Sequence, residues 1–180
     1  MKKPILVLAL LISFVSFAQN GEENDIVLPQ NELRINMTNL IAFKWVDISY
    51  ERVLNEESAI GVSTLFSLDS DADGLDEYRT FSFTPYYRHF FSKKYAKGFF
   101  VEAFGMLHSG KDEYYVYYDT YSEYRGENYT DFAIGISAGA KFITKRGFVA
   151  EFYFGIGRDL LGNSDLEVVG RGGLAIGYRF

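Results

Sequence analysis

Large apolar residues alternate with small or polar residues along most of the chain after residue 30. Between Phe132 and Phe142, for example, every second residue is apolar, and the residues between them are mostly glycine, serine or alanine. A period of two is that of a β-strand, because successive side chains point to opposite faces. The pattern predicts eight strands, over residues 33–38, 46–54, 59–68, 80–87, 99–107, 132–142, 148–156 and 168–180. The first strand is interrupted by Leu40 and Ile41, which break the alternation.

The connections between these strands alternate in length. The short connections are 55–58, 92–98 and 144–147, and the longer ones are 69–77, 109–128 and 159–167. The link over 39–44 is short for a member of the longer set. Short turns on one side and longer loops on the other are typical of outer-membrane barrels, with the turns in the periplasm and the loops outside. An even number of strands places both termini on the periplasmic side.

The two faces of the predicted strands differ in a way that favours a membrane. A soluble barrel buries its large apolar residues, whereas here the opposite face is narrow, rich in glycine and carries few charges. The apolar face is therefore expected to meet lipid, where an open sheet edge is not tolerated and the sheet must close. We predict an all-β fold, an eight-stranded antiparallel up-and-down transmembrane β-barrel over residues 31–180, with a soluble lipocalin-like barrel as the alternative.

Aromatic residues gather near the predicted strand ends, as in the girdles at membrane interfaces. The girdle residues predicted on the periplasmic side are Phe91, Phe99, Phe142, Phe148, Tyr178 and Phe180, and those on the outer side are Tyr78, Phe81, Tyr129 and Phe132.

The N-terminal segment has the pattern of an export signal. Lys2 and Lys3 precede an apolar run over 5–15, and Ser16 and Ala18 supply small residues before a cleavage site. We predict a signal peptide over 1–18 and a periplasmic leader over 19–30, with a membrane-anchor helix as the alternative. The mature chain then carries 16 basic and 24 acidic residues, which argues against a nucleic-acid partner. The chain has no cysteine, which excludes disulfides and thiolate metal sites.

The chain resembles the small eight-stranded outer-membrane barrels. The resemblance rests on the signal peptide, the strand and turn rhythm over 31–180 and the last residues, GGLAIGYRF, in which Tyr178 and Phe180 resemble the C-terminal signal that the barrel-assembly machinery reads. The opening NELRINMTNLIAF and the stretch SYERVLN are similar to an uncharacterised family of such barrels. The resemblance implies location in the outer membrane of a Gram-negative-type bacterium, contact with outer-membrane lipid and assembly by that machinery, but no known activity.

Charged residues fall on the inward face near the predicted periplasmic ends. In strand order their signs alternate: Arg34, Glu51, Arg88, Glu102, Lys141 and Glu151, with Arg171 or Arg179 on the last strand closing the ring beside Arg34. Charges in a narrow lumen are costly unless they are paired. We expect Arg88 to face Glu102 and Lys141 to face Glu151, so that the network fills the lumen. A gate for a narrow pore is the alternative.

Two loop segments carry candidate binding chemistry. Residues 69–74, DSDADG, match the start of a calcium loop, but the twelfth position is Thr80 rather than glutamate. We interpret this segment as a solvated acidic loop and leave weak divalent binding open. Tyrosines crowd the longest connection: Tyr114, Tyr115, Tyr117, Tyr118, Tyr121, Tyr124 and Tyr129. They indicate either a hairpin that extends two strands above the membrane or a surface binding patch.

Candidates for catalysis are sparse. His108 and Ser109 could form half of a lipid-hydrolase site, with Asp112 or Glu113 orienting the histidine, and His89 with Ser92 is no better supported. We therefore predict a protein that is not an enzyme and has no cofactor and no metal site. The predicted function is that of a non-catalytic, monomeric envelope barrel that presents surface loops; a narrow pore and a lipid-modifying enzyme are the alternatives.

Overall fold

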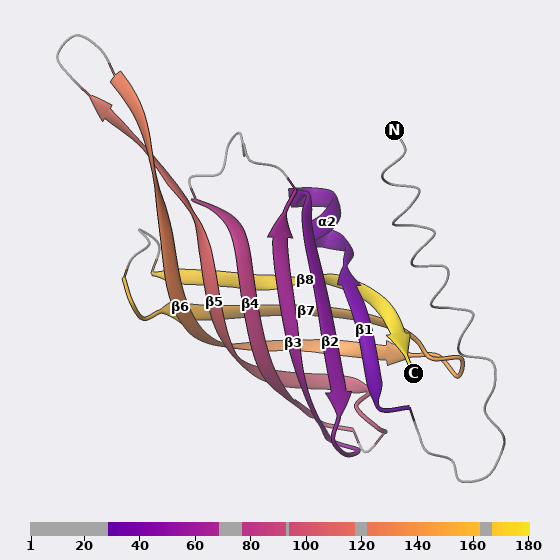
Figure 1. Cartoon of the computed structure of the whole chain (residues 1–180). Helices are drawn as coiled ribbons and strands as arrows, with labels where there is room; N and C mark the ends of the chain where they lie inside the picture. The colour runs from indigo at the N-terminus through magenta and orange to yellow at the C-terminus, as the bar shows by residue number, and fades with distance from the viewer. Residues whose placement is uncertain (1–28, 69–76, 93, 118–121, 163–166) are drawn as a thin grey trace, which may run out of the picture. The chain divides into compact units, whose positions relative to one another are not determined.

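The computed structural model describes residues 29–68, 77–92, 94–117, 122–162 and 167–180. The predicted signal peptide, nearly all of the predicted leader and the acidic segment 69–74 lie outside the described residues. Figure 1 shows the elements in chain order: β1 (Asn31–Asn36), α2 (Met37–Phe43), β2 (Trp45–Val53), β3 (Ser58–Ser67), β4 (Glu77–Phe90), β5 (Gly98–Tyr117), β6 (Ser122–Ile143), β7 (Phe148–Asp159) and β8 (Val168–Arg179).

The eight strands form a closed antiparallel barrel in which each strand pairs with its neighbour in sequence. The barrel closes between the first and last strands, where Leu33 lies opposite Tyr178 and Ile35 opposite Ile176. The predicted all-β, eight-stranded antiparallel barrel is thus confirmed. We call the end with the β2–β3, β4–β5 and β6–β7 connections the turn end, and the opposite end the loop end. Within the described residues, no helix is long and apolar enough to cross a membrane.

The first predicted strand extends two residues too far, because Met37 and Thr38 begin the short helix α2. The Asn36 side chain caps the helix by accepting a hydrogen bond from the Asn39 backbone N–H at 3.2 Å. Lys44 ends the helix in the left-handed region, with a φ of 54°. At the loop end α2 lies beside β8, where the Leu174 N–H donates to Thr38 Oγ1 at 2.9 Å. The break in alternation at Leu40 and Ile41 thus marks a helix.

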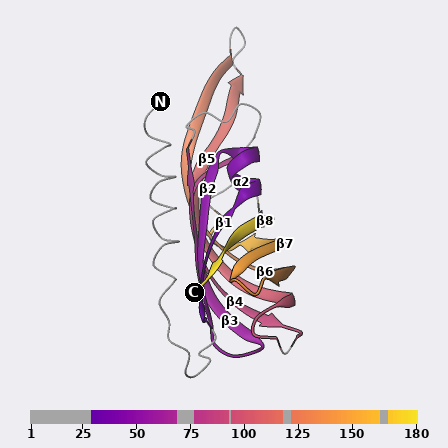
Figure 2. The same ribbon diagram turned by 90° about the vertical axis from the view of Figure 1, so that its right-hand side faces the viewer.

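The longest predicted connection, 109–128, is mostly not a loop. It forms the hairpin of two extended strands that the sequence offered as one interpretation. β5 continues to Tyr117 and β6 begins at Ser122, and the two strands pair without interruption from Gly98 opposite Lys141 to Tyr117 opposite Ser122. Figure 2 shows this hairpin projecting beyond the other strands at the loop end. The tyrosine side chains between 114 and 124, and with them the predicted binding patch, lie outside the described side chains.

Burial along the strands follows the alternation of the sequence. β7 is the clearest case, because its residues alternate between exposed and buried from Phe148 to Arg158. Outward positions carry large apolar residues such as Ile136 and Phe154, of which 68% and 74% are exposed. The prediction that Tyr129 belongs to the outer girdle is wrong, because this residue is buried. Its ring packs edge-on against His108 inside the barrel, with the ring centroids 5.6 Å apart.

Candidate functional site

Nine of the charged side chains buried among the described residues are joined by ion pairs inside the barrel, most of them in its turn-end half. We call this set the lumen charge cluster: Glu32, Arg34, Glu51, Arg88, Glu102, Lys141, Glu151, Arg171 and Arg179. Each comes from a strand and occupies an inward position of the two-residue alternation, so that its charge is enclosed by the wall. All seven residues that the sequence predicts for a lumen network belong to it, and Glu32 and Arg179 enlarge the set.

Arg34 on β1 lies at the centre of the cluster. Its Nη1 donates to Glu32 Oε2 and to Glu151 Oε2, both at 2.9 Å. Its Nη2 donates to Glu51 Oε2 at 2.8 Å and to Tyr86 Oη at 2.7 Å. The planar guanidinium therefore joins three carboxylates from three different strands, which is the geometry that makes arginine suited to buried ion pairs.

Arg88 on β4 makes the second set of pairs. It lies opposite Glu102 in the β4–β5 register, as expected from the sequence, and its Nε donates to Glu102 Oε2 at 2.5 Å. Its Nη1 also donates to Glu151 Oε2 at 2.7 Å. Ser137 completes the shell of Glu102 by donating from Oγ to Oε1 at 2.9 Å. Glu151 thus links the Arg34 and Arg88 groups across the lumen.

Lys141 faces Glu151 as predicted, but its shorter contacts are with other carboxylates. It lies opposite Glu151 in the β6–β7 register, but its Nζ is 3.9 Å from Glu151 Oε2. Instead, Nζ donates to Glu32 Oε2 at 2.8 Å and to Glu51 Oε1. Arg34 and Arg88 already donate hydrogen bonds to Glu151. The long Lys141 side chain therefore reaches across the lumen to the carboxylates of β1 and β2.

The sequence left open whether Arg171 or Arg179 lies beside Arg34. Arg179 is the nearer in sequence register, because it lies opposite Glu32 on β1 and pairs with that carboxylate, which also binds Arg34, whereas Arg171 pairs with Glu102. Arg179 Nη1 and Nη2 also donate to the backbone oxygens of Tyr95 and Ala96, at 2.6 and 3.0 Å, and so hold the β4–β5 turn against β8. Glu32 was missed in the sequence, although its position two residues before Arg34 places it on the same face.

Aromatic rings pack against the cations of the cluster. The Arg88 guanidinium lies 4.2 Å from the Phe100 centroid and 4.7 Å from the Tyr86 centroid, and Lys141 Nζ lies 5.1 Å from that of Phe90. The Arg171 guanidinium lies 5.0 Å from the Tyr86 ring. Such contacts favour a cation that has lost its water. They could have been predicted only with the register and the barrel diameter in hand.

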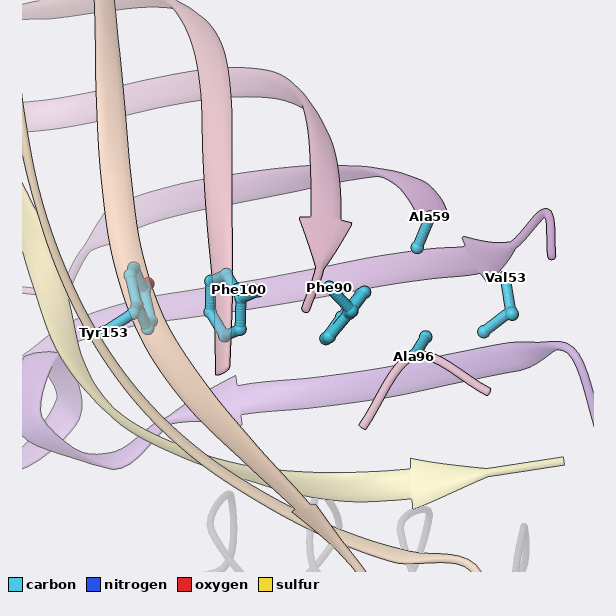
Figure 3. Packing of buried hydrophobic residues seen from close by; sticks show 6 residues of the cluster. All are labelled: Val53, Ala59, Phe90, Ala96, Phe100 and Tyr153. Atoms are coloured by element: carbon cyan, nitrogen blue, oxygen red, sulfur yellow. The ribbon is translucent and has the colours of Figure 1, made fainter. Parts of the chain in front are cut away.

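Apolar layers lie on both sides of the cluster. Along β5 the inward residues run Phe100, Glu102, Phe104, so a charge is flanked by two rings. Figure 3 shows the turn-end layer, in which Phe90 and Phe100 pack together with centroids 5.5 Å apart. Val53, Ala59, Ala96 and Tyr153 complete this layer, and the loop-end layer consists of Tyr86, Phe104, Met106, Ala133 and Val169.

A second polar group lies towards the loop end, where β1 gives way to α2. Asp47 Oδ1 accepts from Ser63 Oγ at 2.6 Å, and its Oδ2 accepts from Asn36 Nδ2 at 3.2 Å and from Asn39 Nδ2 at 2.8 Å. Asn36 Nδ2 also lies 3.2 Å from Tyr153 Oη. With Asp47 included, this part of the lumen holds five acidic residues beside the five basic residues of the lumen charge cluster.

The two catalytic candidates are not assembled as serine–histidine pairs. His108 and Ser109 are consecutive in β5 and point to opposite faces, and His108 Nε2 lies 2.8 Å from Asp159 Oδ1. Asp159 is thus a carboxylate partner of His108, while the side chains of the sequence candidates Asp112 and Glu113 lie outside the described part. His89 packs edge-on against Phe91. Ser92 Oγ donates to the Lys97 backbone oxygen instead.

The described residues offer no metal ligand set, since no group of three histidine or acidic side chains among them could hold an ion. The predicted C-terminal signal residues are both exposed, and the Tyr178 ring packs edge-on against Phe148 at 5.6 Å. No family model matches the chain, and no curated protein and no solved structure matches it significantly. The two faces of the barrel wall carry the chemistry that bears on function.

Proposed function

We propose that the chain is a non-catalytic β-barrel of the outer membrane, whose wall meets lipid and whose lumen is closed by the lumen charge cluster. The observation that carries this proposal is the inversion of the two faces. Large apolar side chains such as Phe99, Phe154 and Ile136 are exposed on the outside, while arginine, lysine and glutamate are buried inside.

The inversion is costly in water and favourable in a bilayer. Burial of apolar surface contributes roughly 25 cal/mol per Å², and a soluble protein rarely leaves contiguous apolar patches above a few hundred Å² exposed. Here the exposed apolar residues recur on β2 to β8 around the wall. A closed barrel also satisfies the backbone hydrogen bonds that lipid cannot provide. Both features support a membrane-spanning wall, and the long hairpin of β5 and β6 favours the loop end as the outer one.

The contents of the lumen favour a sealed barrel over a narrow pore. An eight-stranded barrel is just wide enough for side chains to fill its interior. Here ion pairs of 2.5–2.9 Å span the turn-end half, and rings pack on either side of them. In this proposal the barrel serves the envelope as a monomeric anchor for its loop-end hairpin rather than as a conduit.

The proposal is tested by insertion and conductance together. Purified protein is refolded with lipid vesicles, assayed for heat-modifiable gel mobility and then reconstituted in a planar bilayer. We expect a folded, vesicle-associated barrel without resolvable conductance. A folded protein that stays in the aqueous phase would instead identify a soluble lipocalin-like barrel, and stepwise conductance would identify a narrow pore. An unchanged lipid A mass spectrum in cells with and without the protein is expected, since the proposal excludes lipid modification.

A further inference from the structure

A groove crosses the outer face of the barrel wall at the loop end of β5 to β8. It has a volume of about 700 Å³ and is lined by Ala103, Ile134, Ile136, Ile156, Arg158 and Val168, among others. The register explains its depth, because Ala103 lies opposite Ile136 and so leaves a gap beside a large side chain. Gly135 and Gly157 border it through their backbone only, since a Cβ at either would point into the lumen towards Phe104.

The groove continues towards the turn end. A second depression of about 500 Å³ shares Ala103, Ile136 and Ile156 with the first and extends to Tyr87 and Phe154. Its floor includes Ala138, which lies opposite Phe154 in the β6–β7 register. Together the two depressions form a channel-like surface feature, called here the wall groove, that follows the strands and is bordered by apolar side chains.

One end of the wall groove carries a cation with a weak partner. Arg158 lies next to the last residue of β7, and its Nη2 is 3.5 Å from Glu167 Oε2. The two side chains are 74% and 80% exposed, so water screens the pair and the attraction is small. An arginine in this state is available to an anion, and phosphate is one of the anions that the guanidinium fork binds through two hydrogen bonds.

We propose that the wall groove binds one phosphate-bearing lipid of the outer leaflet. An acyl chain lies along Ala103 and Ala138, and Arg158 binds the phosphate. This inference rests on the proposed function, since it needs the wall to face lipid. Charge complementarity at a single end distinguishes this occupant from a second copy of the chain, which would have to place another apolar wall against the groove without an anion for Arg158.

The test uses four proteins and two lipids. Wild type, Ala103→Leu, Arg158→Gln and Ala150→Leu are refolded in neutral detergent containing dimyristoyl phosphatidic acid or dimyristoyl glycerol, and bound lipid is counted by native mass spectrometry. Ala103→Leu fills the groove with an apolar side chain that the outer face tolerates. Ala150→Leu makes the same change on the outer face of β7 outside the groove and serves as the matched control.

We expect wild type and Ala150→Leu to retain phosphatidic acid, and Ala103→Leu to lose it. Arg158→Gln should weaken retention of phosphatidic acid about tenfold and leave that of the diacylglycerol unchanged. Equal retention of the two lipids by wild type, or unchanged retention by Ala103→Leu, would overturn the inference. Dimers that Ala103→Leu abolishes would also overturn it, in favour of an interface between copies.

Heat-modifiable mobility in vesicles separates this inference from the proposed function. If wild type does not insert, the proposed function fails and the lipid site fails with it. If all four proteins insert but none retains phosphatidic acid selectively, the lipid site alone is wrong and the membrane barrel stands.

Discussion

The inner and outer faces of the same strands obey different rules. On β6, Ile136 and Ser137 are neighbours in sequence, yet Ile136 is 68% exposed on the outer wall, whereas Ser137 is buried and bonded to Glu102. The outer face needs only apolar surface, so its residues are interchangeable within that class. The inner face needs particular partners, because each buried charge depends on atoms from other strands. On the inner face, substitutions should therefore lower the stability when they remove a partner. On the outer face, they should lower it when they introduce a charge.

The largest effect is expected for Arg34→Met, at the centre of the inner face. The substitution removes the ion pairs of Arg34 with Glu32, Glu51 and Glu151 at once. Removing one partner from a buried ion pair costs about 3–5 kcal/mol, and here three pairs lose the same partner. Urea unfolding in detergent, followed by the fluorescence of Trp45, measures the loss. Adding Glu51→Gln should restore part of the stability, and two strictly additive losses would contradict a coupled cluster.

The outer face should respond to charge rather than to shape. Ile136→Lys places a cation against lipid and should lower stability by about 2–4 kcal/mol near the midplane of the bilayer. Ile136→Leu is the matched control and should be close to neutral. The measurement is reversible unfolding in vesicles. A neutral Ile136→Lys would mean that the outer wall is solvated.

On the inner face, a substitution near the loop end should lower the stability less than one near the turn end. His108→Leu removes the 2.8 Å contact with Asp159 but breaks one bond rather than three ion pairs. We expect a loss of about 1–3 kcal/mol, the usual cost of leaving one buried polar group without that partner. The same urea titration measures it. A loss that equals that of Arg34→Met would contradict the difference between the two ends.

The smallest effect is expected for the exposed pair outside the lumen. Glu167→Gln removes the partner of Arg158, but water screens both side chains, so stability in lipid-free detergent should change by less than about 0.5 kcal/mol. This pair has the same chemistry as those of the lumen charge cluster and differs in burial alone. A loss above about 1 kcal/mol, seen in the same titration, would show that exposure does not separate the two classes of ion pair.

Much of the architecture was predictable because a period of two leaves its mark on every strand. The inward position of Arg34, Glu102 and Glu151 follows from parity alone. The partners were harder to predict. Register identifies Cα neighbours such as Arg88 and Glu102, but Lys141 crosses the lumen to Glu32, and that contact depends on the barrel diameter.

The two remaining differences between prediction and structure arise where two sequence patterns overlap. The strand pattern that begins at Leu33 was extended over Thr38, although the spacing of Met37, Leu40 and Ile41 is that of a helix. Tyr129 was assigned to the outer girdle as an aromatic near a strand end. Its parity with the buried Asp131 places it inside, and parity would have been the better guide.

The central claim is that one face of each strand meets lipid while the other encloses a sealed lumen. The chain has no cysteine, so single cysteines can be introduced one at a time. Ile136→Cys, Ser137→Cys and Lys145→Cys test the wall, the lumen and the β6–β7 turn, with a fluorescent maleimide on protein in vesicles. The account predicts that nitroxide-bearing lipid quenches the label at 136, that 137 stays unlabelled and that aqueous iodide quenches the label at 145. Iodide quenching at 136 equal to that at 145, without quenching by the lipid, would contradict it.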